Sequence, residues 1–209
     1  MAKALSADES RIVRLANTFK VTLSREAQDG LLLWLAEIAR WNKVHDLTAA
    51  RNMDEFHDLM LADAFHLAAI LKSDAVVVDI GSGAGAPGLP LAITRPDLKM
   101  TLIEPLMKRV SFMRSVIGQV KREDIGLHAG KGEEFVDKLR PDIAISRATL
   151  APTAWLDLGL RFCEEVAVLV TDEASAPPAP VGFDRRLTPY LWPLTHVNRV
   201  SAIYSRSAG

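Results

Sequence analysis

The sequence predicts an α/β fold, in which a mostly parallel sheet of seven strands follows a helical N-terminal cap. Three observations lead to this prediction. The first 74 residues show helical periodicity, the chain beyond them alternates short β-branched runs with segments long enough for helices, and two longer runs near the end resemble edge strands. Alternating strands and helices are typical of right-handed βαβ units around a parallel sheet.

The N-terminal cap is expected to hold two long helices. Between Glu26 and Trp41, apolar residues recur at intervals of three and four, as one buried helical face requires. A second helix is expected over Met53–Leu71, and neither stretch contains proline. We place the boundary near residues 72–74, which divides one compact unit into a cap (1–74) and a core (75–209).

In the core, strands and helices are expected to alternate. Five parallel strands are predicted at Ala75–Ile80, Met100–Ile103, Ile125–His128, Ile143–Ser146 and Val166–Val170. The helices between them are predicted at Leu89–Thr94, Met107–Gln119, Glu133–Leu139 and Thr153–Phe162. After a proline-rich loop, two antiparallel edge strands are expected at Arg185–Leu191 and Val197–Ser205.

Composition excludes several classes of protein. With 49% hydrophobic residues and a net charge of −1, the 209-residue chain is not a disordered protein. A single cysteine, Cys163, excludes a disulfide framework and is expected to be a small core residue. No apolar run approaches the length of a membrane span, and the N-terminus lacks the apolar region of a signal peptide, so we expect a cytoplasmic protein.

The charge balance argues against a protein whose whole surface binds nucleic acid, but the charge is uneven. Residues 95–122 carry seven basic and two acidic side chains, whereas residues 1–74 carry nine basic and eleven acidic ones. The basic stretch fits either a phosphate-binding face or an ordinary solvated helix face.

The segment Asp79–Gly88 is the most informative part of the sequence. A buried strand ending at Ile80 leads into the alternating glycines Gly81, Gly83 and Gly85. Glycine tolerates positive φ and lets a ligand approach the backbone closely. A helix start follows, with Pro87 expected at its first position, and open α/β sheets bind ligands at such a place.

Three interpretations of this loop are possible. Residues 83–88 read G-x-G-x-x-G, which allows a dinucleotide site, and a merely tight turn is the plainest alternative. We favour a third interpretation. Asp79 can accept hydrogen bonds from an ammonium group or order the loop, and Glu104, at the end of the next strand, can accept two ribose hydroxyls. This pattern is typical of class I S-adenosyl-L-methionine (SAM)-dependent methyltransferases, which have a Rossmann-like fold.

Five segments of the chain resemble one family, RsmG (GidB). They are WNKVHDLTAAR (41–51), DIGSGAGAPGLPLA (79–92), KRVSF (108–112), GKGEEF (130–135) and ISRA (145–148). RsmG enzymes methylate N7 of one guanine in 16S ribosomal RNA. The resemblance therefore implies SAM as cofactor and 16S ribosomal RNA, or the small ribosomal subunit, as partner.

The resemblance also implies roles for individual residues. Gly81 and Ala86 are expected to contact the cofactor, Gly132 and Glu133 to lie beside its adenine, and Arg147 to serve catalysis at the cofactor and target pocket. Together with the acids and the other glycines of the loop, the expected cofactor-binding residues are Asp79, Gly81, Gly83, Gly85, Ala86, Glu104, Gly132, Glu133 and Arg147. These positions follow the ends of consecutive strands, which is one edge of one sheet.

This sequence departs from the family pattern at three places. Asp46 stands where the family usually has Asn, Leu59 and Met60 replace an Arg-His pair before Asp63, and Thr171-Asp172 replaces Lys-Gly. The changes concern the side expected to face RNA, so they affect the inferred substrate more than the inferred cofactor. A methyltransferase for another RNA or a small molecule, or a SAM- or RNA-binding protein without catalysis, remain alternatives.

The remaining candidates have plainer explanations. The five histidines are scattered without ligand spacing, so no metal site is expected. Trp41 is either a stacking platform for RNA or a packing residue, and His45 either lines the target pocket or is structural. Guanine N7 carries a lone pair at neutral pH, so no general base is required. We expect a monomer, although the sequence leaves the oligomeric state open.

Overall fold

A computed structural model describes residues 6–42 and 50–207 of the chain. The predictions made for His45 and Asp46 lie outside the described residues. Within them, one sheet contains all of the predicted strands: β1 Val76–Ile80, β2 Lys99–Glu104, β3 Gly126–Ala129, β4 Ile143–Ser146, β5 Glu165–Val170, β6 Phe183–Leu191 and β7 Asn198–Arg206. The α-helices are α1 Ala7–Thr18, α2 Arg25–Trp41, α3 Met53–His57, α4 Asp63–Ile70, α5 Gly88–Thr94, α6 Met107–Gln119 and α7 Pro152–Gly159.

The strand order is β3-β2-β1-β4-β5-β7-β6. Strands β1 to β5 pair in parallel, whereas β7 lies antiparallel between β5 and β6. The predicted antiparallel pair at one edge is thus confirmed. Because β1, β2, β4 and β5 run in the same direction, the loops that follow them lie at a common edge of the sheet, where open α/β sheets bind ligands.

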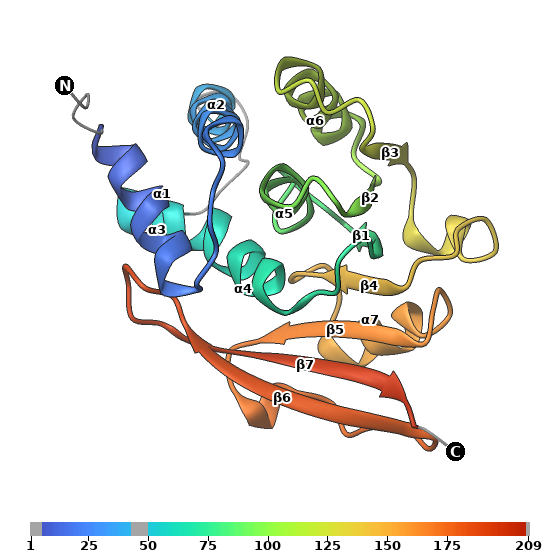
Figure 1. Ribbon diagram of the computed structural model, residues 1–209. Helices are drawn as coiled ribbons and strands as arrows, with labels where there is room; N and C mark the ends of the chain where they lie inside the picture. The colour runs from blue at the N-terminus through green and yellow to red at the C-terminus, as the bar shows by residue number, and fades with distance from the viewer. Residues whose placement is uncertain (1–5, 43–49, 208–209) are drawn as a thin grey trace.

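Helices cover both faces of the sheet (Figure 1). On one face, α2, α4, α5 and α6 share an apolar core with the strands, and on the other face α7 packs against β4 and β5. Strand β1 contributes to both cores, because Val77 belongs to the first and Val78 to the second. A strand buried on both faces has apolar residues at successive positions, without polar alternation. This uninterrupted apolar run is the pattern from which the sequence predicts the strand.

Helix α1 was not delimited from the sequence, although a signal for it is present. The Ser6 hydroxyl accepts a hydrogen bond from the Glu9 amide, and the Glu9 carboxylate accepts one from the Ser6 amide. This reciprocal capping box satisfies backbone donors that otherwise lack partners at a helix start. Ile12 and Leu15 form the buried face of the helix.

The predicted helix over Met53–Leu71 is interrupted. Its middle, Asp58–Ala62, is a π-helical segment between α3 and α4. Such wide turns inside α-helices are rare and are often found at functional sites. The division of the chain at residues 72–74 into a cap and a core stays a prediction.

Two further predictions need correction. The helix expected over Glu133–Leu139 is only a short 3₁₀ turn, Gly132–Phe135, because the Glu134 and Lys138 amides bond to carbonyls three residues earlier, and the α-type hydrogen bond from Leu139 to Phe135 follows only at the end. Pro87 precedes α5 rather than occupying its first position, and the helix begins at Gly88. No helix among the described residues is long and apolar enough to cross a membrane.

Candidate active site

The glycine-rich loop after β1 adopts the backbone conformations that its sequence predicts. Gly81, Gly83 and Gly85 have φ values of 72°, 61° and 105°. At these angles a side chain is strained. A Cβ at Gly81 would also lie 2.3 Å from the Thr149 hydroxyl, and one at Gly85 would lie 2.9 Å from Leu89 Cβ. Glycine is therefore required for conformation at all three positions, and for space at Gly81 and Gly85.

Asp79 orders this loop, which is one of the two roles expected for it. Its Oδ2 accepts a hydrogen bond of 2.9 Å from the Gly88 amide at the start of α5. A Cβ at Gly88 would lie 2.5 Å from the same oxygen, so only glycine allows this approach. Burial raises the pKa of Asp79 to about 7, and its Oδ1 has no hydrogen-bond partner among the described residues. Asp79 is not among the residues that line the cavity described next.

Glu104 connects the loops that follow β1 and β2. Its Oε2 accepts a hydrogen bond of 2.9 Å from the Gly83 amide, and its Oε1 accepts one of 3.0 Å from the Leu106 amide. The residue is buried, yet it lines a cavity at the edge of the sheet. Each carboxylate oxygen has two acceptor positions, so both oxygens retain capacity for a ligand hydroxyl.

A cavity of about 540 Å³ opens at the ends of β1, β2 and β4. Its wall combines the glycine loop, the turn after β2 and the turn after β4, and the cap contributes the π-helical segment. The lining residues from the predicted site are Gly81, Gly83, Ala86, Glu104 and Arg147. Arg109 of α6 also reaches this wall, and the departures Leu59 and Met60 lie directly in it.

Four of the predicted cofactor-binding residues lie apart from this cavity. Besides Asp79, these are Gly85, whose space is taken by Leu89 and Trp34, and the pair Gly132 and Glu133. Gly132 is buried against Ile80, because a Cβ there would lie 2.7 Å from Ile80 Cγ2, and Glu133 is exposed. The structure thus gives Gly132 and Gly85 packing reasons to be glycine.

Arg147 follows β4 and lies between two cavities. It lines the large cavity and also a second one of about 260 Å³, which Trp155, Thr171 and Arg199 help to form. Its Nη1 donates hydrogen bonds to the Leu59 carbonyl and to the Asp63 carboxylate. The side chain is 13% exposed. A planar guanidinium in this position can bond or stack on a base.

Asp63 is the site residue that sequence reasoning did not single out. It is buried in α4, with a carboxylate that contacts Arg147, Tyr190 and Trp192. A signal for it exists, since Asp63 is an acid inside the apolar run Leu59–Leu67, and a buried acid needs partners. Sequence alone does not identify those partners, because they come from the turn after β4 and from the β6–β7 hairpin, more than eighty residues later.

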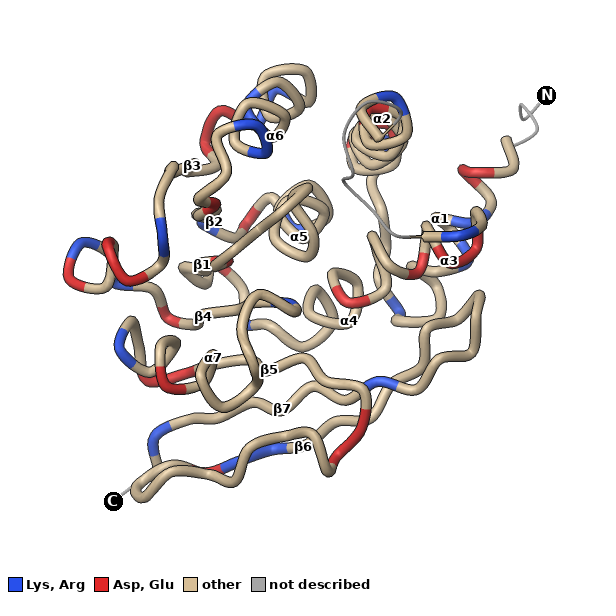
Figure 2. The backbone as a smooth tube through the Cα atoms, turned by 180° about the vertical axis from the view of Figure 1, so that it is seen from behind, with Lys and Arg blue, Asp and Glu red and all other residues tan. Residues whose placement is uncertain are grey.

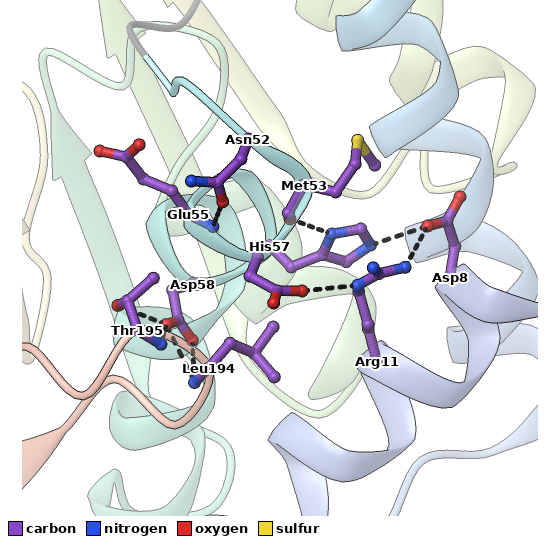
Figure 3. Close-up of polar contacts among 10 residues, drawn as sticks. Asp8, Arg11, Asn52, Met53, Glu55, His57, Asp58, Leu194 and Thr195 are labelled. Carbon is purple, nitrogen blue, oxygen red and sulfur yellow. Dashed lines mark hydrogen bonds and ion pairs between the residues drawn. The ribbon is translucent and has the colours of Figure 1, made fainter.

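Polar contacts at the start of the π-helical segment connect α3 with α1, and the segment itself with the turn between β6 and β7 (Figure 3). His57 Nδ1 is 2.7 Å from the Met53 carbonyl, and its Nε2 is 3.5 Å from an Asp8 oxygen of α1. Burial lowers the pKa of His57. Asp58 accepts hydrogen bonds from the Leu194 and Thr195 amides and from the Thr195 hydroxyl. None of these residues lines either cavity at the sheet edge, so their role is structural.

The other candidates are resolved by their contacts. Trp41 is half-buried and packs edge-on against Phe112 with ring centres 5.3 Å apart, which supports the packing interpretation. Burial raises the pKa of the Cys163 thiol to about 11, which suits an unreactive thiol rather than a nucleophile. Thr171 donates a hydrogen bond to Asp172, whose carboxylate caps the following 3₁₀ turn.

The basic side chains of residues 95–122 differ in their surroundings. Arg95 and Arg122 are bound to Asp97 and Asp124 and to backbone carbonyls, so they brace the fold. Lys108 and Arg114 of α6 are exposed. Figure 2 shows basic segments on α6 with an acidic segment beside it near β3. Only part of the predicted charge is therefore available to a phosphate.

A model of the family described as rRNA small subunit methyltransferase G (GidB) matches residues 27–166, about two thirds of the chain. The chain belongs to this family. The matched range contains the glycine loop, Glu104 and Arg147, and it ends within β5. The GidB resemblance inferred from five short segments is thereby confirmed.

Curated relatives carry the same description. The ribosomal RNA small subunit methyltransferase G of Methylobacillus flagellatus is 40% identical over 126 residues, which cover 60% of this chain and 61% of that protein. The protein of that name from Neisseria gonorrhoeae is 32% identical over 126 residues, with 60% of each chain covered. The match thus spans about three fifths of the length of these relatives.

Solved structures share the fold at low sequence identity. An O-methyltransferase from Bacillus cereus has a TM-score of 0.57 at 11% identity, with 81% of this chain and 90% of that chain covered. The putative methyltransferase yhhF from Escherichia coli has a TM-score of 0.53 at 17% identity, with 68% and 82% covered. This chain therefore has the class I methyltransferase fold, as predicted.

Proposed function

We propose that this protein is a SAM-dependent methyltransferase that methylates N7 of a guanine in 16S ribosomal RNA. Family membership supports the reaction, and one structural observation supports the assignment of that reaction to a site around Arg147. Arg147 is shared by a large cavity under the glycine loop and a smaller cavity beside it. This arrangement suits a donor and an acceptor that meet at one arginine.

The large cavity fits SAM in size and chemistry. Its volume of about 540 Å³ lies within the range of roughly 300–1,000 Å³ that is usual for small-ligand sites. Gly81 and Gly83 expose backbone at positive φ, and Glu104 retains acceptor capacity for ribose hydroxyls. We therefore propose Gly81, Gly83, Ala86, Glu104 and Arg147 as cofactor-contacting residues.

Asp79, Gly85 and Gly132 receive a supporting role in this proposal. Asp79 holds the start of α5, and Gly85 and Gly132 allow close packing around the loop. Glu133 is exposed beyond the wall of the cavity.

The chemistry requires positioning rather than proton transfer. Bound SAM supplies an electrophilic methyl group, and guanine N7 attacks it with a lone pair that is already available at neutral pH. The protein contributes by holding the two reactants in line and excluding water, which can supply most of the rate enhancement. Arg147 suits this role, because its guanidinium can bond the guanine edge or stack on the ring.

The smaller cavity is the proposed place of the acceptor base. Its volume of about 260 Å³ is bounded by Trp155, Leu150, Thr171 and Arg199, with Arg147 toward the larger cavity. An extruded base requires an apolar pocket with a few hydrogen-bonding groups, and this wall provides both. A partner on the ribosome also implies a cytoplasmic location.

The test is a map of N7-methylguanine in the 16S RNA of a strain lacking this protein. Loss of one methyl group, restored by the purified protein with SAM, is the expected result. Unchanged methylation removes the ribosomal assignment. Calorimetry with SAM and with NAD then separates a methyltransferase for another acceptor from a dinucleotide-binding protein, because binding of NAD alone contradicts both methyltransferase interpretations.

A further inference from the structure

Asp63 is a buried carboxylate on which four later side chains converge. It is 1% exposed, and its Oδ2 lies 3.3 Å from Nη1 of Arg147 and 4.0 Å from Nη2 of Arg199. Its Oδ1 accepts hydrogen bonds of 2.8 Å from the Tyr190 hydroxyl and from the Trp192 indole. One carboxylate of α4 therefore connects the turn after β4 with the β6–β7 hairpin.

Only one nitrogen of Arg147 is occupied by these contacts. Nη1 donates to the Leu59 carbonyl and to Asp63, and the hydrogen bonds of the described residues include none from Nε or Nη2 of Arg147. Two acceptors on one nitrogen restrict the rotation of the planar guanidinium. The remaining N–H groups are available to a ligand at the two cavities that Arg147 lines.

The support for Asp63 is itself rigid. Burial raises the pKa of Tyr190 well above its ordinary value, so its hydroxyl keeps its proton and donates to Asp63. The Tyr190 ring stacks on His66 at 3.9 Å, and the guanidinium of Arg199 lies 4.6 Å from the Trp192 ring centre. Both donors to Oδ1 are thus packed in place.

A purely structural ion pair is the competing explanation. Asp58 makes the comparison possible, because it lies five residues earlier, is equally buried, and binds the same C-terminal hairpin through Leu194 and Thr195. It makes no contact with Arg147. If both acids served only to attach the hairpin, their substitution would have equal effects on the reaction.

We propose that Asp63 is a positioning residue, which holds Arg147 between the donor and acceptor cavities, and that Tyr190 and Trp192 hold Asp63. The inference rests on the proposed methyl transfer. It makes the β6–β7 hairpin, which lies beyond the residues 27–166 matched by the family model, a contributor to the active site.

The test compares Asp63→Asn with Asp58→Asn. Each substitution removes one charge without changing shape, but only the first acts on Arg147. Transfer of a labelled methyl group from SAM to small ribosomal subunits is measured below the melting temperatures of both variants. We expect kcat to fall at least about tenfold for Asp63→Asn, a larger change than that in the Kd for SAM, which Arg147 is also proposed to contact. Both parameters are expected to stay within about twofold for Asp58→Asn.

A second measurement does not depend on activity. Phenylglyoxal modifies accessible arginine side chains, and peptide mass spectrometry reports its rate at Arg147. Release of the guanidinium predicts a rate about threefold higher or more in Asp63→Asn, and an unchanged rate in Asp58→Asn. Tyr190→Phe preserves the stack on His66 and removes one donor to Asp63, so it is expected to show a smaller change in the same direction.

The outcomes are distinct. An Asp63→Asn variant with near-normal kcat, or with unchanged reactivity of Arg147, overturns the positioning role. If the unmodified protein transfers no methyl group to ribosomal RNA, the proposed function fails, and the reactivity of Arg147 still decides whether Asp63 positions it. If Asp63→Asn does not fold, Tyr190→Phe decides, since normal kcat and normal reactivity in that variant contradict the inference.

Discussion

Trp34 of α2 donates a hydrogen bond from its indole Nε1 to the Ala84 carbonyl, over 3.0 Å. Ala84 lies in the glycine loop and lines the large cavity, whereas Trp34 is fully buried in the core beneath it. An N-terminal helix therefore fixes the backbone that is proposed to hold the cofactor. This contact joins residues fifty positions apart in sequence.

We predict that Trp34→Phe weakens both the fold and SAM binding. The Ala84 carbonyl loses its buried partner, which costs about 1–3 kcal/mol of stability. If about 1 kcal/mol of this loss destabilises the SAM-binding conformation of the glycine loop, the Kd for SAM measured by calorimetry rises about fivefold. Trp155→Phe is the matched control, because its indole donates to the Ala167 carbonyl on the other face of the sheet. Equal Kd values for the two variants contradict the prediction.

Gly81→Ala is predicted to abolish measurable SAM binding at millimolar concentration. The new methyl group meets Thr149 at 2.3 Å in addition to the strain of φ at 72°. Gly182→Ala isolates the strain, because Gly182 has a φ of 81° with no atom near the added carbon. Thermal unfolding of the control is expected to report a loss of about 1–2 kcal/mol without a change in SAM binding. Unimpaired SAM binding by Gly81→Ala argues against the loop as the cofactor site.

The pKa of Asp79 predicts a pH-dependent stability. The folded protein keeps this proton up to about pH 7. In the unfolded chain the proton leaves near pH 4, about the ordinary value. Between these values the folded state binds one proton more, so the contribution of Asp79 to stability falls as pH rises and is constant above pH 7.

Asp79→Asn removes this titration. Urea unfolding is measured from pH 5 to 8. The free energy of unfolding of the variant is expected to rise relative to that of the natural protein up to about pH 7, and the difference between them is expected to be constant above that pH. Asp97→Asn is the control, because Arg95 lowers the pKa of Asp97 to about 2 and both of its states titrate below this range. A constant difference for Asp79→Asn across the range rejects a raised pKa.

Arg147→Lys is predicted to keep the positive charge but to lower the rate of methyl transfer strongly. Lysine lacks the planar fork that serves the Leu59 carbonyl, Asp63 and a base together. Loss of one or two charge-assisted hydrogen bonds, at about 1.5–3 kcal/mol each, lowers methyl transfer by about 10- to 100-fold or more. Arg95→Lys is the control, since Arg95 braces backbone carbonyls and Asp97. Unchanged methylation with Arg147→Lys supports a binding protein without catalysis.

Lys108 and Arg114 are predicted to contact RNA phosphates. Both are exposed on α6, so charge reversal of the pair is expected to weaken binding to 16S RNA and to lower the slope of log K against log salt by about two. The control reverses Arg161 and Arg186, which are exposed near α7 and on β6. Equal losses for the two pairs indicate a general charge effect rather than a face on α6.

The strands could be predicted because burial on both faces removes polar residues from their sequences. Val77 and Val78 serve different cores, and that double burial is visible as an uninterrupted apolar run. The break in the helix between α3 and α4 could not be predicted, since its polar anchors bind residues that are distant in sequence. Asp58 reaches Thr195, and Asp63 reaches Tyr190.

The candidate site was predicted in part for a related reason. The end of a strand identifies the edge of the sheet, so Gly81, Glu104 and Arg147 were found there together. It does not give the distance across that edge, and Gly132 lies against Ile80 rather than in the cavity wall. Asp63 was not identified because the topology, and not the local sequence, brings the partners of its carboxylate to it.

Glu104 has a mechanical consequence beyond its capacity to accept a hydroxyl. One side chain binds the Gly83 amide with one oxygen and the Leu106 amide with the other, so the two walls of the cavity are clamped by the same carboxylate. Neither loop moves outward without breaking a part-buried hydrogen bond to this carboxylate. The entrance to the cavity therefore has a fixed width in the absence of a ligand, and the binding site is preorganised.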